Sequence, residues 1–497
     1  MELRQLVKEL GDASVEGGLD REVSGIAYDS RRVTPGMMFV AVPGQRTDGH
    51  EYINTALERG ATAIICERNG ILPQRATKIK VADVREALAR VATAFYGNPS
   101  LKLKVIGVTG TNGKTTVSFM VKSILEAAGI KTGLLGTVHY EIGDRVIPAQ
   151  RTTPESLEVQ HMMAQMVKAG CQACVMEVSS HALEQKRVLG IQFDVAIFTN
   201  LTRDHLDFHG TMEDYFTAKR KLFEVLGQGG KKSAAVINID DDFGARLTGL
   251  TNVEVELTYG LQKTARLRAS NLQLSHDGSR FTVEADDRKF ACRLPLIGRH
   301  NIYNALAAVG AGLAMDIEVV KIQAALNAMT PVPGRLESVA LGQSFGVFVD
   351  YAHTDDALKN VLSTLREITK GRVLVAFGCG GNRDSGKRAK MGRIAAELAD
   401  YTIITSDNPR KESPEKIAGQ IEEGFREVNG TGYRMELDRR RAIHQIIAEA
   451  KPGDTVLIAG KGHETYQEFE DTVVPFDDRV HAREAIEAAM GSGKPAA

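Results

Sequence analysis

The sequence predicts an α/β protein with three domains, in which the central domain and a Rossmann-like last domain are each built on a parallel sheet. Short apolar runs alternate with helical patterns along the chain. At 497 residues, the chain is too long for one hydrophobic core. Two proline-containing segments, 97–100 and 331–334, follow helical patterns and precede apolar strands. We therefore expect domains at residues 1–98, 99–332 and 333–497.

The elements follow this division in chain order. The first domain closes with a helical pattern over 84–96. The central domain opens with a strand at 105–108, a glycine-rich turn and a helix over 114–128. The last domain repeats strands separated by helical stretches, which is typical of a doubly wound sheet. Its strands are expected at 347–350, 373–377, 401–405 and 456–459.

Composition excludes several classes of protein. Apolar residues make up 43% and charged residues 25%, and the net charge of −1 gives no general attraction for nucleic acid or an anionic membrane. The first residues, Met1–Leu6, carry charges and lack the apolar run of a signal peptide, and no stretch approaches the roughly 18 apolar residues of a membrane helix. We expect a cytoplasmic monomer. Cys171 and Cys174 form a CxxC without a second pair nearby, which favours buried thiols over a metal site.

A phosphate site is predicted where the first strand of the central domain meets its helix. Backbone N–H groups of the turn and the helix N-terminus can hold phosphates there. Lys114 would reach the β- and γ-phosphates of a nucleotide, and the Thr115 hydroxyl would bind Mg²⁺. Val108 replaces the first glycine of the common P-loop. The loop alone does not distinguish a motor, a GTPase, a kinase or a ligase. The predicted nucleotide-binding residues here are Gly110, Thr111, Asn112, Gly113, Lys114, Thr115 and Thr116.

Two further strands of the central domain end in polar residues. Glu177 ends an apolar strand and is suited to a second Mg²⁺ contact. A strand at 195–200 runs into a loop that contains His205. A single loop histidine is more often a hydrogen bonder than a metal ligand, but its place at a strand end favours a functional role. Lys219, in a helical run, would by composition be a solvated surface lysine.

A series of motifs in one order resembles the Mur ligases over nearly the whole chain. The motifs are Thr109–Thr115, Glu177–His181, Asn200–Asp207, Ala218-Lys219 with Leu222-Phe223, Gly298–Asn304, Gly334–Glu337 and Asp350–Thr354. The resemblance explains Val108, because Thr-Gly-Thr-Asn-Gly-Lys-Thr is the family's own form of the loop. It implies an ATP-dependent, ADP-forming carbon–nitrogen ligase of peptidoglycan synthesis, with consequences for cell shape and cell division.

The resemblance also implies a metal-assisted mechanism. In the family, the lysine that matches Lys219 is carbamylated by CO₂, which replaces a cation by two anionic oxygens suited to Mg²⁺. One Mg²⁺ would lie on Thr115 and Glu177, and another on His205 and Lys219. Lys114 would complete the catalytic set, and an acyl phosphate would form before the amine attacks. Family positions that hold the nucleotide are matched by Asn301, Arg335, Asp350 and His353.

The same resemblance implies that the first domain contributes to an acceptor site. Segment 28–41 is similar to the UDP-binding segment of Mur enzymes that add the third and later residues, with Ser30 at the uridine diphosphate. A plain turn at Pro35-Gly36 is compatible with this reading. Arg151 is left out of the site. Positions that hold UDP-N-acetylmuramoyl-L-alanyl-D-glutamate are matched by Thr152, Thr153, Ser179, Gln185 and Arg187.

Three loops of the last domain, 378–384, 407–410 and 460–464, each follow a predicted strand, so they should converge. Asp-Asn-Pro-Arg at 407–410 resembles the family members that add diaminopimelate, whereas lysine-adding members generally lack the arginine. A guanidinium is a natural bidentate partner for the distal carboxylate of meso-diaminopimelate. The residues expected to bind it are Arg383, Asp407, Asn408, Pro409, Arg410, Gly460 and Glu464.

Three alternatives remain at this point. A lysine-adding ligase would share everything except the recognition loop, and Arg410 argues against it. A folylpolyglutamate synthetase shares the fold but is not expected to carry the Ser30 segment or the Asp-Asn-Pro-Arg sequence. A P-loop switch or scaffold protein would bind nucleotide without using an amino-acid pocket.

Overall fold

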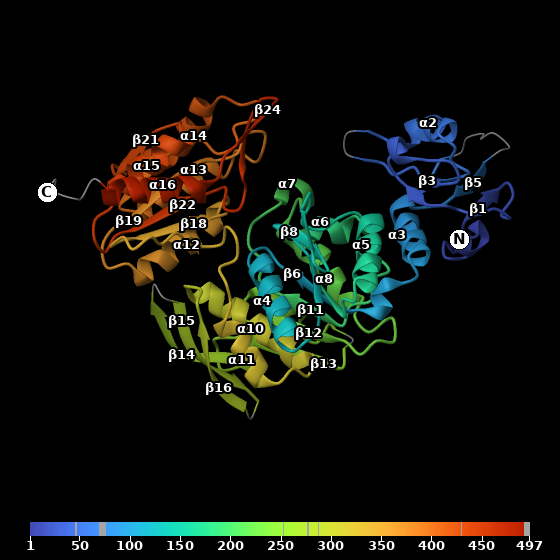
Figure 1. Ribbon diagram of the computed structural model, residues 1–497, viewed down its shortest axis with the longest axis horizontal. Helices are drawn as coiled ribbons and strands as arrows, with labels where there is room; N and C mark the ends of the chain where they lie inside the picture. Colours follow the sequence, from blue (N-terminus) through green and yellow to red (C-terminus); the bar gives the residue numbers. More distant parts are fainter. Residues whose placement is uncertain are drawn as a thin grey trace.

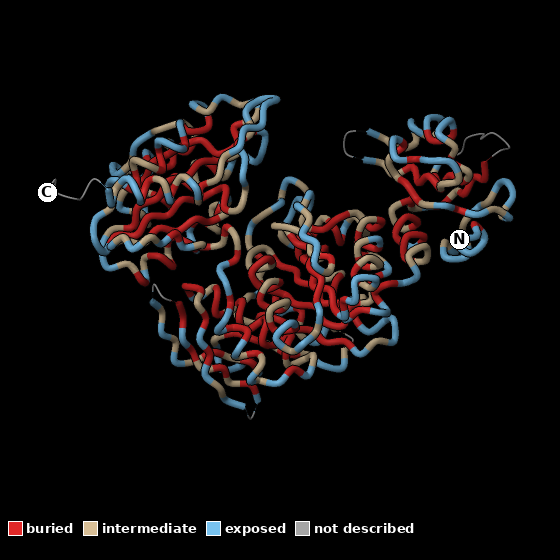
Figure 2. The backbone as a smooth tube through the Cα atoms, in the orientation of Figure 1, coloured by how far each residue is buried: buried red, intermediate tan, exposed pale blue. Residues whose placement is uncertain are grey.

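The computed structural model describes residues 1–44, 47–68, 76–251, 253–275, 278–286, 288–428 and 430–491. It contains sheets of five, eleven and six strands and a two-stranded hairpin. Figure 1 shows the three large sheets in separate lobes, with the green and yellow lobe between the blue and the red ones. In Figure 2, the buried backbone is concentrated in the strands and in the helix faces that cover them. The predicted three-domain α/β architecture is confirmed.

The N-terminal sheet has the strand order β1-β5-β4-β3-β2, and only β1 is antiparallel to its neighbour. The predicted helix over 84–96 is α3, which begins where the Asp83 carboxylate accepts hydrogen bonds from the N–H groups of Arg85 and Glu86. The elements are α1 Leu3–Lys8, β1 Ser14–Glu16, β2 Ile26–Ala27, η1 Ser30–Arg32, β3 Met38–Val40, η2 Gly49–Tyr52, α2 Ile53–Glu58, β4 Ala63–Cys66, β5 Thr77–Lys80, α3 Val84–Phe95 and η3 Pro99–Lys102.

The central sheet has the order β16-β15-β14-β13-β12-β11-β6-β10-β7-β8-β9. Its middle, from β14 to β7, is parallel, and antiparallel strands extend it at both edges. The strands are β6 Lys104–Thr109, β7 Thr132–Leu135, β8 His139–Ile142, β9 Arg145–Pro148, β10 Ala173–Glu177, β11 Val195–Phe198, β12 Ala234–Asn238, β13 Val255–Gly260, β14 Leu267–Ser275, β15 Gly278–Ala285 and β16 Arg288–Leu294.

Helices cover both faces of this sheet and bury a separate apolar core on each. Val117 of α4 and Ile302 of α10 belong to one core, and Val159 of α5 and Leu222 of α8 belong to the other. Fully apolar parallel strands covered on both sides are typical of α/β proteins. The helices are α4 Lys114–Ala127, α5 Ser156–Lys168, α6 Ser180–Glu184, α7 Leu206–His209, α8 Met212–Glu224, α9 Asp242–Leu247, α10 Arg299–Ala314 and α11 Val319–Asn327.

The C-terminal sheet has the order β17-β18-β22-β19-β20-β21 and is parallel apart from β17. Helices α12–α14 pack on one face and α15–α16 on the other, which confirms the predicted doubly wound arrangement. The elements are β17 Glu337–Ser338, β18 Gly346–Asp350, α12 Asp355–Ile368, β19 Val373–Phe377, α13 Arg388–Leu398, β20 Tyr401–Ile404, α14 Pro414–Glu427, β21 Tyr433–Met435, α15 Arg439–Ala448, β22 Thr455–Ala459, β23 Tyr466–Phe469, β24 Thr472–Pro475 and α16 Asp478–Gly491.

Two expectations drawn from composition can be compared with the structure. All five cysteines are free and buried, which confirms the interpretation of Cys171 and Cys174 as buried thiols. Burial also raises the pKa of Cys174, so this thiol stays protonated. Of the helices in the described ranges, none is both long and apolar enough to cross a membrane.

Candidate active site

The glycine-rich turn between β6 and α4 has a backbone that only glycine can adopt. Gly110 and Gly113 have φ values of +145° and +88°. A Cβ atom at Gly110 would lie 1.9 Å from Thr199 Oγ1, and one at Gly113 would lie 2.4 Å from Asn304 Oδ1. Helix α4 then begins at Lys114 with no side-chain cap on its first turn. Its first N–H groups are therefore available to an anion, as the sequence predicted for a phosphate site.

Lys114 lies folded over this turn. Its Nζ donates hydrogen bonds to the carbonyl oxygens of Gly110 and Thr111, at 2.9 and 2.7 Å. Burial lowers the pKa of Lys114, and the Glu177 carboxylate partly opposes that effect. Among the residues that the structure describes, the ammonium donates only to these two backbone oxygens, which a phosphate could replace.

Thr115 and Glu177 are in direct contact, because the carboxyl ends of β6 and β10 lie side by side. Thr115 Oγ1 donates to Glu177 Oε2 at 3.1 Å. Glu177 also accepts hydrogen bonds from the N–H and the hydroxyl of Thr137, at 2.8 and 2.9 Å. A buried carboxylate beside a threonine hydroxyl supplies the oxygen ligands that Mg²⁺ prefers, so these residues fit the predicted metal.

Arg335, from the segment that precedes β17, reaches this pair from the C-terminal domain. Its Nη2 donates to Thr115 Oγ1 at 3.2 Å. Its buried Nε has no hydrogen-bond partner among the residues that the structure describes. A buried guanidinium N–H without a partner fits an oxyanion at this point. The guanidinium also lies over the Tyr351 ring, 5.1 Å from its centroid.

Lys219 is buried, with 1% of its surface exposed, so the composition-based expectation of a solvated lysine is wrong. The side chain lies on the face of α8 that packs against the sheet. Its Nζ donates to the carbonyl oxygen of Gly110 at 2.7 Å and lies 4.5 Å from the centre of the Tyr215 ring. Burial, reinforced by nearby Lys114, lowers the pKa of Lys219 well below its usual value.

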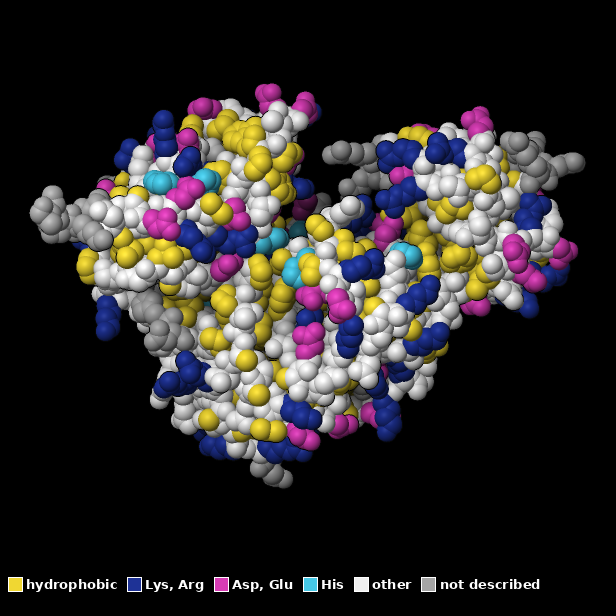
Figure 3. All heavy atoms as spheres, viewed as in Figure 1, with side chains coloured by type: hydrophobic (Ala, Val, Ile, Leu, Met, Phe, Trp, Pro, Cys, Tyr) yellow, Lys and Arg dark blue, Asp and Glu magenta, His cyan; other side chains and the backbone are white. Residues whose placement is uncertain are grey.

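His205 lies in a group of aromatic side chains at α7. Its backbone has a φ of +54°, and its ring lies 4.7 Å from that of His181 and 6.2 Å from that of Tyr215. Burial lowers the pKa of His205 to about 4, so the imidazole is neutral at physiological pH. His205 and Lys219 therefore flank the same tyrosine. Figure 3 shows histidine side chains gathered in the hollow between the C-terminal and central lobes.

The predicted metal residues lie in two separate pairs rather than in one cluster. Thr115 is hydrogen-bonded to Glu177, whereas Lys219 and His205 each lie near the ring of Tyr215. Across the described ranges, no three His, Cys, Asp or Glu side chains are close enough to hold a metal ion. A metal in this region would need oxygen atoms from a bound phosphate or from a modified lysine.

The remaining nucleotide-site residues predicted from the sequence support the turn indirectly. Asn301 accepts a hydrogen bond from Asn304 at 3.0 Å, and Asn304 lies against Gly113. Asp350 accepts hydrogen bonds from the N–H groups of Leu336 and Ala352, both at 2.7 Å. His353 Nδ1 lies 2.8 Å from the carbonyl oxygen of Tyr351. In this structure Asp350 and His353 thus hold the backbone around Arg335 and Tyr351.

A contact between the glycine-rich turn and helix α12 was not predicted from the sequence. Asp356, in the first turn of α12, accepts hydrogen bonds from Asn112 Nδ2 at 2.8 Å and from Thr202 Oγ1 at 2.9 Å. The C-terminal domain therefore touches the phosphate site through Asp356 as well as Arg335. No motif marks Asp356, because its partners lie more than 150 residues away in sequence.

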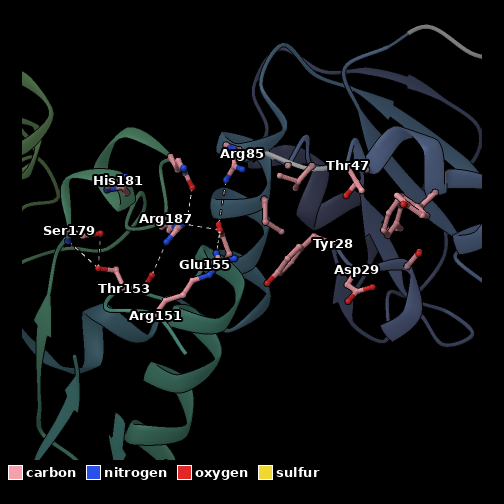
Figure 4. Close-up of a pocket in the computed structure, with 18 of the residues that line it drawn as sticks. Tyr28, Asp29, Thr47, Arg85, Arg151, Thr153, Glu155, Ser179, His181 and Arg187 are labelled. Carbon is pink, nitrogen blue, oxygen red and sulfur yellow. Dashed lines mark hydrogen bonds and ion pairs between the residues drawn. The ribbon is translucent and has the colours of Figure 1, made fainter. Parts of the chain in front are cut away.

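A cavity of about 1000 Å³ lies between the N-terminal and central domains (Figure 4). Its walls contain all the residues that the sequence predicted for the acceptor: Ser30, Thr152, Thr153, Ser179, Gln185 and Arg187. They also contain residues that sequence reasoning missed or left out, namely Tyr28, Arg85, Arg151, Glu155 and His181. Figure 4 shows that these side chains come from both domains.

Positive charge predominates in part of this cavity. The Glu155 carboxylate lies 2.5 Å from Arg151 Nη1, 3.1 Å from Arg187 Nε and 3.5 Å from Arg85 Nη1. Three guanidinium groups around one carboxylate leave an excess of positive charge, which favours an anionic ligand. Arg85 comes from α3 of the N-terminal domain, so this cluster also joins the two domains.

The three loops of the C-terminal domain converge as predicted. Asn408 Nδ2 donates to Glu464 Oε2 at 3.0 Å, and a Cβ atom at Gly460 would lie 2.6 Å from Asp407 Oδ2. A Cβ atom at Gly380 would lie 3.1 Å from Arg410 Nη1 and 3.9 Å from Arg383 Cγ. A Cβ atom at Gly381 would lie 1.9 Å from the carbonyl oxygen of Pro409.

Sequence reasoning missed two charged residues of this cluster. Lys461 is fully buried, and its Nζ donates to Asn408 Oδ1 at 2.9 Å and to Glu464 Oε2 at 3.1 Å. Glu468, on β23, pairs with Arg410 at 2.8 Å. Burial raises the pKa of Glu464, and Lys461 opposes that rise. A cluster with both signs of charge is suited to a zwitterionic ligand.

Three family models match the chain along most of its length. They describe a Mur ligase catalytic domain at residues 22–96, a Mur ligase middle domain at 108–312 and a Mur ligase glutamate ligase domain at 334–462. The chain belongs to the Mur ligase family. As a Mur ligase it is an ATP-dependent enzyme that forms an amide bond, as the sequence predicted.

Individual relatives align with this Mur ligase from end to end. A protein of Syntrophomonas wolfei is 46% identical over 486 residues, which cover 98% of this chain and 99% of the relative. A protein of Geobacter metallireducens is 44% identical over 511 residues, which cover 99% of this chain and 100% of the relative. Both are named UDP-N-acetylmuramoyl-L-alanyl-D-glutamate–2,6-diaminopimelate ligase. A solved structure with the same name is 33% identical, has a TM-score of 0.72 and covers 99% of both chains.

Proposed function

We propose that this Mur ligase joins meso-2,6-diaminopimelate to UDP-N-acetylmuramoyl-L-alanyl-D-glutamate, with conversion of ATP to ADP and phosphate. The observation that carries the choice of amino acid is the arrangement of Arg410, whose guanidinium lies beside the Gly380-Gly381 turn where the three loops converge. The names of relatives at 44–46% identity over nearly the whole chain support the same choice. The reaction belongs to peptidoglycan precursor synthesis and is proposed to occur in the cytoplasm.

The acceptor is assigned to the cavity between the N-terminal and central domains. The precursor carries a diphosphate and carboxylates, and the excess of guanidinium groups around Glu155 is complementary to such charges. Ser30 would contact the uridine diphosphate. Thr152, Thr153, Ser179, Gln185 and Arg187 would hold the dipeptide, with its reacting carboxylate directed toward the phosphate site.

The glycine-rich turn and Lys114 would hold the β- and γ-phosphates of ATP. Mg²⁺ bound by Thr115 and Glu177 would neutralise charge on the phosphates. The acceptor carboxylate attacks the γ-phosphorus, ADP leaves, and an acyl phosphate results. The amine of diaminopimelate then attacks the acyl carbon, loses a proton and expels phosphate. Arg335 stabilises the negative charge that develops on the transferred group.

Lys219 is assigned a role as a carbamate. Burial lowers the pKa of Lys219 well below its usual value, which favours the neutral amine that can attack CO₂. After loss of a proton, the resulting carbamate would place one negative charge, shared by two oxygens, near His205, where the described residues supply no carboxylate cluster for a second Mg²⁺. This role would account for a buried lysine whose hydrogen-bond partner is a single carbonyl oxygen.

The three domains would divide the work. Residues 1–98 bind the UDP part of the acceptor, residues 99–332 bind ATP, and residues 333–497 bind the amino acid. Arg335 and Asp356 already bring the C-terminal domain to the phosphate site. A monomer contains every group that this scheme requires.

Phosphate release measured with each substrate omitted in turn tests the proposal. We expect release from ATP and Mg²⁺ only when the UDP-linked dipeptide is present, and sustained turnover only when diaminopimelate is added as well. Mass spectrometry should then find one diaminopimelate added to the precursor. ATP hydrolysis that ignores both substrates would instead support a nucleotide switch, and ligation of lysine alone would support the lysine-adding alternative.

A further inference from the structure

Arg410 has an unusual local structure for a residue assigned to substrate recognition. Its backbone lies in the left-handed region, with a φ of +51°, and its side chain is 22% exposed. Nε donates to Glu468 Oε2 at 2.8 Å, and Nη1 donates to the carbonyl oxygen of Gly381 at 2.9 Å. Nη2 has no hydrogen-bond partner among the described residues. The guanidinium is thus held on one side and free on the other.

We propose that Glu468 is a positioning residue for amino-acid recognition, which holds the Arg410 guanidinium ready for the distal carboxylate of a diamino dicarboxylic acid. The inference rests on the proposed function and adds a residue to it. Arginine has a long side chain, and fixing it only when the ligand arrives weakens binding. A carboxylate that already engages Nε removes part of that cost and leaves Nη2 for the ligand.

The side chain of Glu468 is not needed to fix the backbone around it. Arg410 N donates to the carbonyl oxygen of Glu468 at 3.0 Å, and Glu470 N donates to the carbonyl oxygen of Arg410 at 2.7 Å. Gln467 Nε2 also donates to the carbonyl oxygen of Asp407 at 2.9 Å. These bonds hold hairpin β23–β24 against the 407–410 loop without the Glu468 carboxylate. What that carboxylate contacts is the guanidinium of Arg410.

The test compares kcat/KM for diaminopimelate and for lysine in the full-length enzyme. We expect Glu468→Ala to lower kcat/KM for diaminopimelate about 3- to 10-fold, mainly through KM, because the pair is partly exposed. The kcat/KM for lysine should stay the same, since lysine has no distal carboxylate. Glu468→Gln should recover part of the loss, because its amide oxygen can still accept the Nε hydrogen bond.

Asp471→Ala is the matched control. Asp471 lies in the turn of the same hairpin, is 91% exposed and lies 3.8 Å from Lys411 rather than Arg410. The control removes a carboxylate of equal charge and should leave kcat/KM for both amino acids unchanged. In an Arg410→Ala background, Glu468→Ala should cause no further loss.

Equal losses for both amino acids, or losses that multiply in the double variant, would overturn the role of Glu468. In that case wild-type ligation of diaminopimelate would still stand. Failure of the wild-type enzyme to ligate diaminopimelate would overturn the proposed function and this inference together. Because Glu468 is 33% exposed, its variants should fold, and an unchanged Tm checks this.

Discussion

The proposed phosphate site of the central domain and the proposed amino-acid site of the C-terminal domain are built differently. At the phosphate site, Thr115, Glu177 and Lys219 are buried and lie on the ends or faces of regular elements. At the amino-acid site, Arg410 lies in a loop with a left-handed backbone and is partly exposed. The first site depends on the parallel sheet, and the second on contacts between loops and a hairpin.

This structural difference should separate the residues that carry out phosphate transfer from those that select the amino acid. Groups on sheet and helix ends keep their geometry whichever amino acid is bound, so changes there should affect all substrates equally. Loop groups can be exchanged with little effect on the fold, so changes there should alter preference and leave phosphate transfer intact. Substitutions of Lys219, Lys114 and Arg410 should therefore differ in how strongly their effects depend on the amino acid.

The largest effect is expected for Lys219→Arg. A guanidinium keeps a positive charge in a buried site, and it cannot form a carbamate. We expect kcat to fall at least about 1,000-fold, the upper end for losing one preorganised charge stabiliser. The loss should be the same with diaminopimelate and lysine.

Steady-state kcat and the mass of the intact protein check this role. Lys219→Glu, which supplies an anion with a shorter reach, should retain slightly more activity than Lys219→Arg. A Lys219→Arg enzyme with near-normal turnover would exclude the carbamate.

A smaller but still large effect is expected for Lys114→Ala. Removing the ammonium from the glycine-rich turn should lower kcat by at least about 100-fold, because a fixed charge at the transferred phosphate is lost. Lys232→Ala removes an 88% exposed lysine of the same domain and serves as the control. Normal phosphate release by the Lys114 variant would remove the turn from the mechanism.

Arg410→Ala should have the smallest effect of the three and the most selective one. Loss of the guanidinium leaves the distal carboxylate without its partner at a partly exposed site, which costs about 2 kcal/mol, or roughly 30-fold in kcat/KM for diaminopimelate. Use of lysine and the affinity for ATP should change far less. Equal losses for both amino acids would mean that Arg410 only supports its loop.

Part of the candidate sites could be predicted from the sequence. The turn at Gly110–Lys114 was predictable because its glycines, its strand and its helix are adjacent in the chain. The cluster of Glu155 with Arg85 and Arg187 was not, because those contacts span 70 and 32 residues and the contact with Arg85 joins two domains. Arg151 was left out because a related sequence could carry Asn at this position, yet it lines the same cavity.

Burial and antiparallel pairing were the other properties that the sequence did not reveal. Lys219 resembles any helical surface lysine until the sheet beneath α8 is known. Lys461 lies in a recognisable loop and Glu468 follows it, but their roles depend on Asn408 and Arg410, which lie 53 and 58 residues earlier. The antiparallel strands β14–β16 were also missed, because their alternation of buried and exposed residues did not enter the prediction.

The most direct test of the central claim is the ratio of kcat/KM for meso-diaminopimelate to that for lysine in the wild-type enzyme, measured with saturating ATP and UDP-linked dipeptide. A site that pairs a substrate group discriminates strongly against an analogue that lacks the group. With Arg410 reading the distal carboxylate, we expect a preference of at least about 100-fold for diaminopimelate. A ratio near one, or a preference for lysine, would contradict this account of the C-terminal site.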